Sequence, residues 1–599
     1  MDGNQPDGPS RSRVLFSRGG LELLACTAAA LVYLRTLTFG FVYDDVLQVF
    51  QNPALHEWRY LPQYFTSHLL AGLYPNAGGN YYRPLVMLWL RLNYVLFGLA
   101  PAGWHVTTVF CHVIATYLVF RFAQEVSGER LVAFIAALLF AVHPAHIENV
   151  AWISGVSDPL MACLLLGSLL AFFAGRGTSS RSKTVAPTIY SLVLFACALL
   201  TKETAVVLPA LVFLWVLAES QTTELAQSAM DGVSRATRVS APYVVVVLVY
   251  AAGRFWALHG FSHPVIALSW AHMLLSCPAV LWFYARHLFL PTSVDEFYPL
   301  RYVEQATACT LLLPLAMLAM VLVVGWFWIR WLSRTGAVER RASWFAVGLI
   351  TLPLLPVLDL RSLTVGDIVH DRYLYLPSVG FVLLLALSLR ELERRKWSPS
   401  FRAVSLIVAG LIAAWFAALT VAQQAQWAND IQLYTRGVES APDNLTVRDN
   451  LANALFAANQ PARAVPVYRD VLQRNPNFWP ANYNLGFTYY KMGNYAAAEE
   501  FLRRAINLDG ADGDQYIYLA LAELQLKKFA DAGEAAHQAI VRNPQARGYH
   551  FVLGLIDESE GDAKAAMAAF RAELMQHPDS APAAAELQKL QTTAANPRP

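Results

Sequence analysis

The sequence predicts an all-α protein in which a polytopic membrane domain of about 11 helical spans is followed by an α-solenoid. Of its 599 residues, 56% are hydrophobic and only 15% are charged, whereas soluble proteins contain about 25% charged residues. The shortage of charge is confined to residues 20–421. The remaining C-terminal region has an ordinary charge density and a repeat of 34 residues, which is typical of a stacked helical array.

The membrane domain is expected over residues 21–421, because a bilayer-spanning helix needs about 20 mostly apolar residues. The polar, basic residues 1–20 form an N-terminal tail, and the next segment has no small-residue cleavage site, so we expect it to be retained as the first span. The predicted spans are 21–39, 105–124, 130–143, 158–175, 187–202, 204–219, 241–258, 305–329, 344–358, 373–389 and 402–421.

Basic loops predict the orientation, since Lys and Arg accumulate on the cytoplasmic side. Besides the N-terminal arginines, four clusters contribute: Arg176, Arg181 and Lys183; Arg235 and Arg238; Arg330, Arg334, Arg340 and Arg341; and Arg390, Arg394, Arg395 and Lys396. All five are cytoplasmic only if the apolar segments 84–100 and 265–290 do not cross. Both segments contain polar residues, so we expect interfacial or re-entrant helices. The first outer loop (40–104) and the C-terminal region then lie outside.

The C-terminal repeat has the spacing of tetratricopeptide repeats. The positions that recur at intervals of 34 are Leu451, Leu485, Leu519 and Leu553, the small residues Ala452, Gly486, Ala520 and Gly554, and Ala464, Ala498, Ala532 and Ala566. The predicted units are a connecting helix at 422–444, repeats at 445–478, 479–512, 513–546 and 547–580, a cap at 581–591 and a tail at 592–599. Such a stack offers a concave face to an extended peptide or glycan and supplies no chemistry by itself.

Cysteine usage and net charge exclude several classes of protein. The six cysteines are scattered singly and form no CxxC pair, which excludes a disulfide framework or a cysteine zinc site as the organising principle. The net charge of +2 argues against a nucleic-acid-binding surface.

Asp44 and Asp45 are the first candidate site residues, because they directly follow the first span. Adjacent carboxylates beside hydrocarbon are costly unless they are used or paired. One could act as a general base on an acceptor hydroxyl or orient a metal. The alternative is that both merely end a span at the water interface.

A second polar cluster, HPAHIENVAWISGVSD, contains His143, His146, Glu148 and Asp158. The two histidines and Glu148 offer metal-ligand chemistry, and a hydrogen-bonded polar turn is the alternative. No cofactor is certain from the sequence, and a divalent metal stays open.

Further cations on the predicted outer face would suit a phosphate. Lys202 and Glu203 are wedged between two apolar runs, either as an adjacent ion pair or with Lys202 as a point charge for phosphate. In the stretch HDRYLYLPSVGF, Arg372 could hold a lipid-linked phosphate, while the nearby tyrosines are also ordinary interfacial anchors. The other residues that we expect to contact the donor phosphate or sugar are Arg83, Glu203, Arg254, Asp371 and Tyr375, together with His143, His146, Glu148 and Asp158 of the second polar cluster.

Taken together, the motifs YDDxxxxxxNPxL, YYRPL, HPAHIENVAWISG, TKET and HDRYLYLPSVGF and the C-terminal repeats resemble the transmembrane and tetratricopeptide-repeat-containing O-mannosyltransferases and their bacterial relatives. The resemblance implies a C-type glycosyltransferase fold and a polyprenyl- or dolichyl-phosphate sugar donor. It also implies that Asp44 or Asp45 is the catalytic base. The chain departs from the family pattern at Val156, where arginine is common, and in DRYLY, where ERYLY is usual.

We therefore expect a membrane glycosyltransferase that passes a sugar, with mannose expected, to a protein hydroxyl recruited by the repeats. The expected location is a bacterial plasma membrane with the repeats outside, or the endoplasmic reticulum membrane in a eukaryote. Two alternatives are a lipid-linked oligosaccharide ligase or polymerase, which would place its key residues in a large late loop, and a non-enzymatic membrane-anchored scaffold. The scaffold leaves the outer polar clusters unexplained.

Overall fold

The computed structural model describes residues 19–73, 79–176, 185–222, 229–260, 268–363, 367–394 and 400–595. Within these ranges the regular secondary structure is helical and includes no strand, which confirms the predicted all-α fold. The chain divides into two compact units, Met1–Arg436 and Gly437–Pro599. Parts of several predicted features lie outside the described residues: the N-terminal tail up to residue 18, the basic residues Arg181, Lys183, Arg395 and Lys396, and the last four residues.

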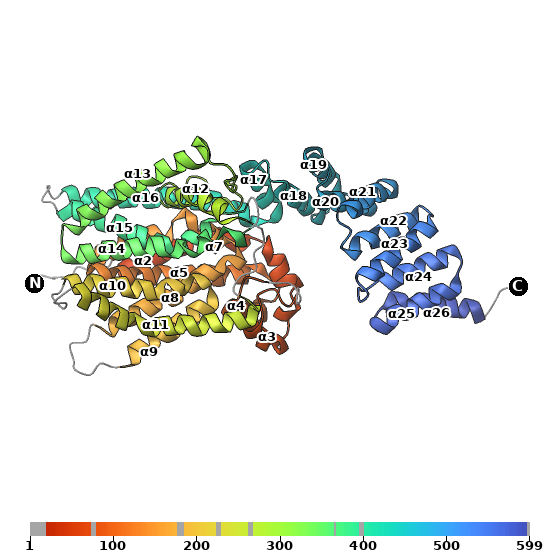
Figure 1. Ribbon diagram of the computed structural model, residues 1–599, viewed down its shortest axis with the longest axis horizontal. Helices are drawn as coiled ribbons and strands as arrows, with labels where there is room; N and C mark the ends of the chain where they lie inside the picture. The colour runs from red at the N-terminus through yellow and green to blue at the C-terminus, as the bar shows by residue number, and fades with distance from the viewer. Residues whose placement is uncertain are drawn as a thin grey trace, which may run out of the picture. The chain divides into compact units, whose positions relative to one another are not determined.

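The first unit is a bundle of apolar helices (Figure 1). Its longer helices are α2 (Gly20–Val32), α4 (Pro84–Phe97), α5 (Pro101–Ser127), α6 (Arg130–Ala141), α8 (Ser157–Ala174), α9 (Val185–Thr201), α10 (Leu208–Thr222), α11 (Ala229–Leu258), α12 (Trp270–Phe289), α13 (Leu313–Ser333), α14 (Ala337–Thr351), α15 (Tyr375–Arg394) and α16 (Ser400–Gln423). Helices α5, α8 and α15 are the most buried of the candidate spans, and their side chains belong to one continuous apolar core.

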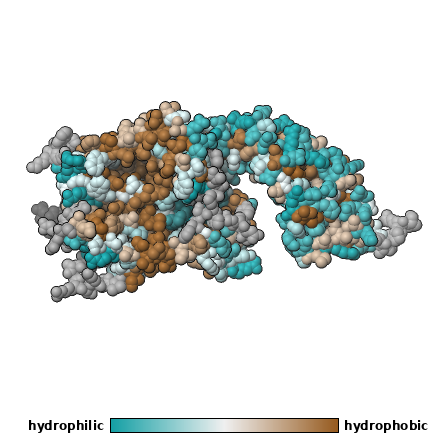
Figure 2. Space-filling view, in the orientation of Figure 1, coloured by the Kyte–Doolittle hydropathy of each residue, from teal (hydrophilic) through white to brown (hydrophobic). Residues whose placement is uncertain are grey.

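Nine helical stretches in the described residues are long and apolar enough to cross a membrane, or ten if the bent pair Arg130–Ala141 and Pro144–Ala151 counts as one span. The chain is thus a multi-pass membrane protein, and a belt of hydrophobic residues runs over the first unit in Figure 2. The predicted span 187–202 is the one that is not among these candidates. It falls on α9, which has 17 residues and is short of the required length of about 20.

The two segments expected not to cross also form helices. Helix α4 has 14 residues, so its length of about 21 Å is less than the hydrocarbon thickness of about 30 Å. Helix α12 contains Pro278 and packs against α13. Neither helix is among the candidate spans.

The second unit is a run of antiparallel helix pairs that follows α17 (Asp430–Ser440). The pairs are α18 (Leu445–Ala457) and α19 (Pro461–Arg474), α20 (Trp479–Lys491) and α21 (Tyr495–Leu508), α22 (Gly513–Gln525) and α23 (Phe529–Arg542), and α24 (Tyr549–Glu560) and α25 (Ala563–Gln576), followed by α26 (Ala581–Ala595). Paired helices touch closely at the small residues. A Cβ atom on Gly486 would lie 2.8 Å from Leu502 Cγ, and one on Gly554 would lie 2.5 Å from Phe570 Cε1.

Candidate functional site

Four charged residues that the sequence singled out line one cavity of about 100 Å³ in the first unit. They are Asp44, Arg83, Lys202 and Arg372. They come from the segment after the first helix, the residue before α4, the junction after α9 and the short 3₁₀ helix η12 (Asp371–Leu374). Other lining residues are Gln48, Leu69, Leu70, Tyr81, Val86, Trp152, Ser154, Ser157 and Tyr373. The structure therefore brings one carboxylate and three cations together around a single space.

The backbone before the acidic pair fixes which carboxylate faces the cavity. Tyr43 has φ 57°, a left-handed conformation that is strained for a bulky residue. Its N–H donates a hydrogen bond to Asp430 Oδ1 at 2.8 Å, which holds the turn in place. After this turn Asp45 is fully buried, whereas Asp44 is partly exposed and lines the cavity.

Asp45 is occupied by hydrogen bonds within the fold. Its carboxylate accepts the N–H of Val42 at 3.1 Å, the N–H of Ser154 at 3.0 Å and the hydroxyl of Ser154 at 2.5 Å. Burial nevertheless raises the pKa of Asp45 to about 7, because desolvation outweighs these bonds. Asp45 thus joins the first outer segment to the second polar cluster.

Asp44, in contrast, has no hydrogen-bond or ion-pair partner within the described residues. Burial raises the pKa of Asp44 above its ordinary value of 3.8, although the charge of Arg372 opposes the shift. An unpaired carboxylate with a raised pKa that faces a polar cavity has the properties of a general base.

Arg83 and Lys202 are each positioned by a carboxylate from another element. Arg83 Nε and Nη2 donate to Glu203 Oε2 at 3.1 Å and Oε1 at 2.6 Å. Lys202 Nζ, which is buried, lies 2.6 Å from Asp158 Oδ2. Lys202 and Glu203 therefore do not form the adjacent ion pair that the sequence left open, because their side chains point to different partners.

Arg372 is held by the second polar cluster. Its backbone N–H donates to Glu148 Oε2 at 2.9 Å, and its guanidinium Nη1 pairs with Glu148 Oε1 and lies 3.4 Å from Glu296 Oε1. Both side-chain contacts use Nη1, so within the described residues Nε and Nη2 have no hydrogen-bond or ion-pair partner.

A second cavity of about 180 Å³ shares Tyr81 and Tyr373 with the first. Arg254 and Glu203 also line it, and Arg254 Nη2 donates to the carbonyl of Asn80 at 2.8 Å. The two cavities together provide polar space around Tyr373. The site residues predicted from the sequence include Tyr375 and not Tyr373.

Seven predicted site residues are buried and line neither cavity. Asp45, Glu148 and Asp158 have the partners described above, and the others are His143, His146, Asp371 and Tyr375. His143 Nε2 bonds the carbonyl of Leu288 at 3.1 Å, and His146 Nε2 bonds Ser378 Oγ at 2.8 Å. Asp371 pairs with His287 at 2.7 Å and with Tyr298, and Tyr375 bonds His112 at 2.8 Å. Each of these four side chains is engaged by packing and hydrogen bonds inside the bundle, and their role as donor contacts stays a prediction.

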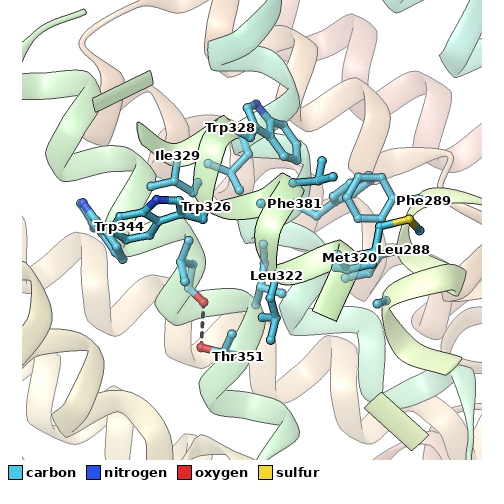
Figure 3. Close-up of a pocket in the computed structure, with 17 residues that line it drawn as sticks. Leu288, Phe289, Met320, Leu322, Trp326, Trp328, Ile329, Trp344, Thr351 and Phe381 are labelled. Atoms are coloured by element: carbon cyan, nitrogen blue, oxygen red, sulfur yellow. Dashed lines mark hydrogen bonds between the residues drawn. The ribbon is translucent and has the colours of Figure 1, made fainter. Parts of the chain in front are cut away.

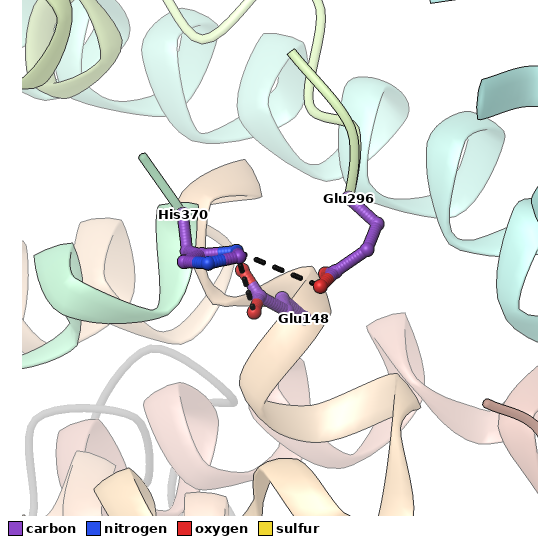
Figure 4. Close-up of side chains that lie close together, drawn as sticks. All are labelled: Glu148, Glu296 and His370. Carbon is purple, nitrogen blue, oxygen red and sulfur yellow. Dashed lines mark ion pairs between the residues drawn. The ribbon is translucent and has the colours of Figure 1, made fainter. Parts of the chain in front are cut away.

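The predicted metal-ligand set of His143, His146 and Glu148 is also not assembled. The described residues instead bring Glu148 together with Glu296 and His370 (Figure 4). Burial raises the pKa of Glu296 to about 8. Glu296 follows α12 in a segment that matches no motif, so only its acidic character between apolar helices could have indicated it.

A larger cavity of about 470 Å³ lies among α12, α13, α14 and α15 (Figure 3). Its lining is apolar and includes Phe289, Trp326, Trp344 and Phe381. The hydroxyl of Thr351 donates to the carbonyl of Val347 at 2.9 Å and is thereby satisfied. This cavity suits hydrocarbon and offers nothing to bind a phosphate or a sugar, so it is not the candidate site.

Comparisons with known proteins give matches for both units. Tetratricopeptide repeat family models match residues 455–524 and 519–585. The chain is 27% identical over 80% of its length to "Protein O-mannosyl-transferase TMTC1" of Homo sapiens and covers 58% of that protein. It is 26% identical over 80% of its length to "Protein O-mannosyl-transferase Tmtc1" of Drosophila melanogaster and covers 64% of that protein.

Among the similar solved structures are two that cover about a quarter of this chain. "Crystal structure of YrrB: a TPR protein with an unusual peptide-binding site" is 22% identical over 28% of this chain and 87% of that one, with a TM-score of 0.26. MamA from Desulfovibrio magneticus RS-1 is 23% identical over 25% of this chain and 85% of that one, with a TM-score of 0.24. The chain spans about three fifths of the length of the curated relatives. Their names confirm the resemblance inferred from the motifs.

Proposed function

We propose that this chain, a relative of the protein O-mannosyl-transferases, transfers a mannosyl group from a polyprenyl- or dolichyl-phosphate donor to a hydroxyl of an acceptor protein. The observation that supports this most directly is the convergence of Arg83, Lys202 and Arg372 with the unpaired Asp44 around one cavity. Cations suit the donor phosphate, and a free carboxylate suits the removal of a hydroxyl proton.

The cations are preorganised for the donor phosphate. A guanidinium has five N–H donors, and Glu148 and Glu203 engage only part of those on Arg372 and Arg83. Each carboxylate thus orients its arginine while other N–H groups remain available for phosphate oxygens. Lys202 adds a point charge that Asp158 holds at the cavity wall. Because the three cations are already in position, little free energy is lost to reorganisation when the leaving phosphate gains charge.

Asp44 is the proposed base, and the transfer needs no reactant other than the donor and the acceptor. The acceptor hydroxyl gives its proton to the Asp44 carboxylate, and its oxygen bonds to the sugar carbon C1. The bond from C1 to the phosphate oxygen breaks, and the lipid phosphate leaves with that electron pair against the three cations. Attack opposite the leaving group inverts the configuration at C1. Asp45 is assigned to positioning, because its carboxylate is already used by three donors.

The repeats are proposed to recruit the acceptor. Aromatic side chains gather on the first helices of successive repeats, where the ring centroids of Phe487 and Tyr518 lie 4.6 Å apart and Lys491 Nζ lies 5.4 Å from that of Phe487. All three side chains are incompletely buried, so they offer a surface on which an extended chain can stack.

The basic clusters support an outer location for the site and the repeats, in a bacterial plasma membrane or the endoplasmic reticulum membrane. Reporter fusions made after Arg341 should score as cytoplasmic, and a fusion after Pro599 should score as external. A cytoplasmic score after Pro599 would reverse this assignment.

Donor binding tests the proposed site separately from turnover. The full chain in detergent should bind polyprenyl-phosphate mannose, and Asp44→Asn should retain this affinity because Asp44 acts on the acceptor. Arg372→Ala should weaken binding by about tenfold or more. Arg59→Ala is the matched control, since the Arg59 side chain is 67% exposed and, within the described residues, contacts Glu57 and Tyr60 of its own loop. Equal donor affinity in the wild type and a folded Arg372→Ala variant would remove Arg372 from the site.

A further inference from the structure

Three buried side chains from separate parts of the first unit converge on one point. Glu148 comes from α7 (Ile147–Ala151), Glu296 from the segment between α12 and the next helix, and His370 from the residue before η12. Each offers a ligand atom within 4.8 Å of the other two, and each residue is 1% exposed. Figure 4 shows the imidazole of His370 directed at both carboxylates.

The contacts inside this cluster leave polar atoms unsatisfied. His370 Nδ1 lies 3.5 Å from Glu296 Oε1 and 4.0 Å from Glu148 Oε1, too far for good hydrogen bonds. His370 Nδ1 and Glu296 Oε2 are buried and have no hydrogen-bond partner. Leaving such a group buried and unpaired is costly, so buried atoms of this kind call for an explanation such as a bound ion.

The charged groups around the cluster also favour a bound ion. The guanidinium of Arg372 is the one cation in ion-pair contact with Glu148 and Glu296 in the described part of the chain. Asp367 adds a further carboxylate 3.6 Å from His370 Nε2. One permanent cation thus stands among three carboxyl groups and an imidazole, so the cluster has oxygen and nitrogen donors to spare for a divalent ion.

We infer that Glu148, Glu296 and His370 form a binding site for a divalent transition-metal ion of the Mn²⁺ or Zn²⁺ type. Imidazole nitrogen combined with carboxylate oxygen suits these ions, whereas Mg²⁺ and Ca²⁺ prefer oxygen alone. Asp367 is placed to orient the imidazole through its other nitrogen, as carboxylates do for metal-bound histidines. Ligands about 2.1 Å from one ion lie at most about 4.2 Å apart, and His370 Nδ1 lies within that span of both Glu296 Oε1 and Glu148 Oε1.

The ion would change what Arg372 does. It would take Glu148 Oε1 from the guanidinium, while the backbone N–H of Arg372 keeps its bond to Glu148 Oε2, so Arg372 stays at the cavity that it already lines with more of its N–H groups available. A metal-loaded site would therefore present a freer arginine to the donor phosphate. This consequence rests on the proposed function, whereas metal binding itself does not.

The test measures metal binding directly, so its result does not depend on transfer activity. The full chain in detergent is stripped with a chelator and titrated with Mn²⁺, and the free ion is followed by electron paramagnetic resonance. We expect one saturable Mn²⁺ per chain, displaced by Zn²⁺ and far less by Mg²⁺. Glu296→Gln and His370→Gln should each weaken Mn²⁺ binding by about tenfold or more, because second-shell changes alone reach 10–100-fold.

Glu304→Gln is the matched control, because Glu304 is an exposed carboxylate in the same segment as Glu296 and should leave Mn²⁺ affinity unchanged. Melting curves identify folded variants, and His370→Gln tests the site from a different element if Glu296→Gln does not fold. The inference is overturned if the wild type binds no stoichiometric Mn²⁺, or if both site variants bind it as tightly as the control.

Discussion

Substitutions of Asp44 and Asp45 should separate catalysis from folding at neighbouring positions. Asp44→Asn keeps the shape of the side chain and removes its charge. Since Asp44 has no partner within the described residues, the variant should fold and melt like the wild type. Loss of a general base should lower the transfer rate by about 10²–10⁴-fold.

Asp45→Ala should have the opposite pattern. It leaves three buried donors without an acceptor: the N–H groups of Val42 and Ser154 and the hydroxyl of Ser154. At about 1–3 kcal/mol for each orphaned donor, the lower end of the range already gives a loss of about 3 kcal/mol. Asp44→Ala is the matched control, since it orphans no donor in the described residues.

The assay pairs melting in detergent with the initial rate of transfer per folded molecule. We expect Asp44→Asn to lose rate without losing stability, and Asp45→Ala to lose stability first. A folded Asp44→Asn variant that transfers at the wild-type rate would exclude Asp44 as the base. An Asp45→Ala variant that melts at the same temperature as Asp44→Ala would show that the three donors do not need Asp45 for stability.

Three further predictions address the phosphate grip, the base and the repeats. Arg372→Lys keeps the charge but cannot hold two phosphate oxygens in parallel, so donor affinity should fall; an unchanged affinity would show that Arg372 serves only as a cation. Because burial raises the pKa of Asp44 above 3.8, the base is protonated as pH falls through that raised value, and the acid limb of the rate should lie above pH 3.8; a flat rate down to pH 4 in folded protein would contradict this. Gly486→Val should destabilise the second unit by about 1–3 kcal/mol, because a Cβ would lie 3.0 Å from Leu502 N; unchanged melting of that unit would show that the helices separate there at no cost.

Local patterns in the sequence were enough to predict the helical class, the repeats and Asp44, Arg83, Lys202 and Arg372 as candidates. Charges beside apolar runs must be used or paired wherever they occur, and a 34-residue period reflects contact between neighbouring repeats. Neither inference needs long-range information.

The division of labour between Asp44 and Asp45 could not be predicted in this way. It depends on the left-handed backbone of Tyr43 and on its bond to Asp430, which lies 387 residues away. Likewise, Lys202 pairs with Asp158 rather than with Glu203, because adjacent residues at a helix end point to different neighbours. Glu296 belongs to no motif and is brought to His370 only by the packing of the bundle.

The most direct test of the proposed function is transfer by the purified full chain. Polyprenyl-phosphate mannose is supplied with a polypeptide that the repeats retain, and the polypeptide is analysed by intact mass and by fragmentation. The wild type should add the mass of one hexose to a Ser or Thr hydroxyl, Asp44→Asn should do so at least about 10²-fold less, and no addition should occur without the lipid-linked donor. A wild-type protein that binds both the donor and the polypeptide yet leaves the polypeptide unmodified would contradict the proposed transfer.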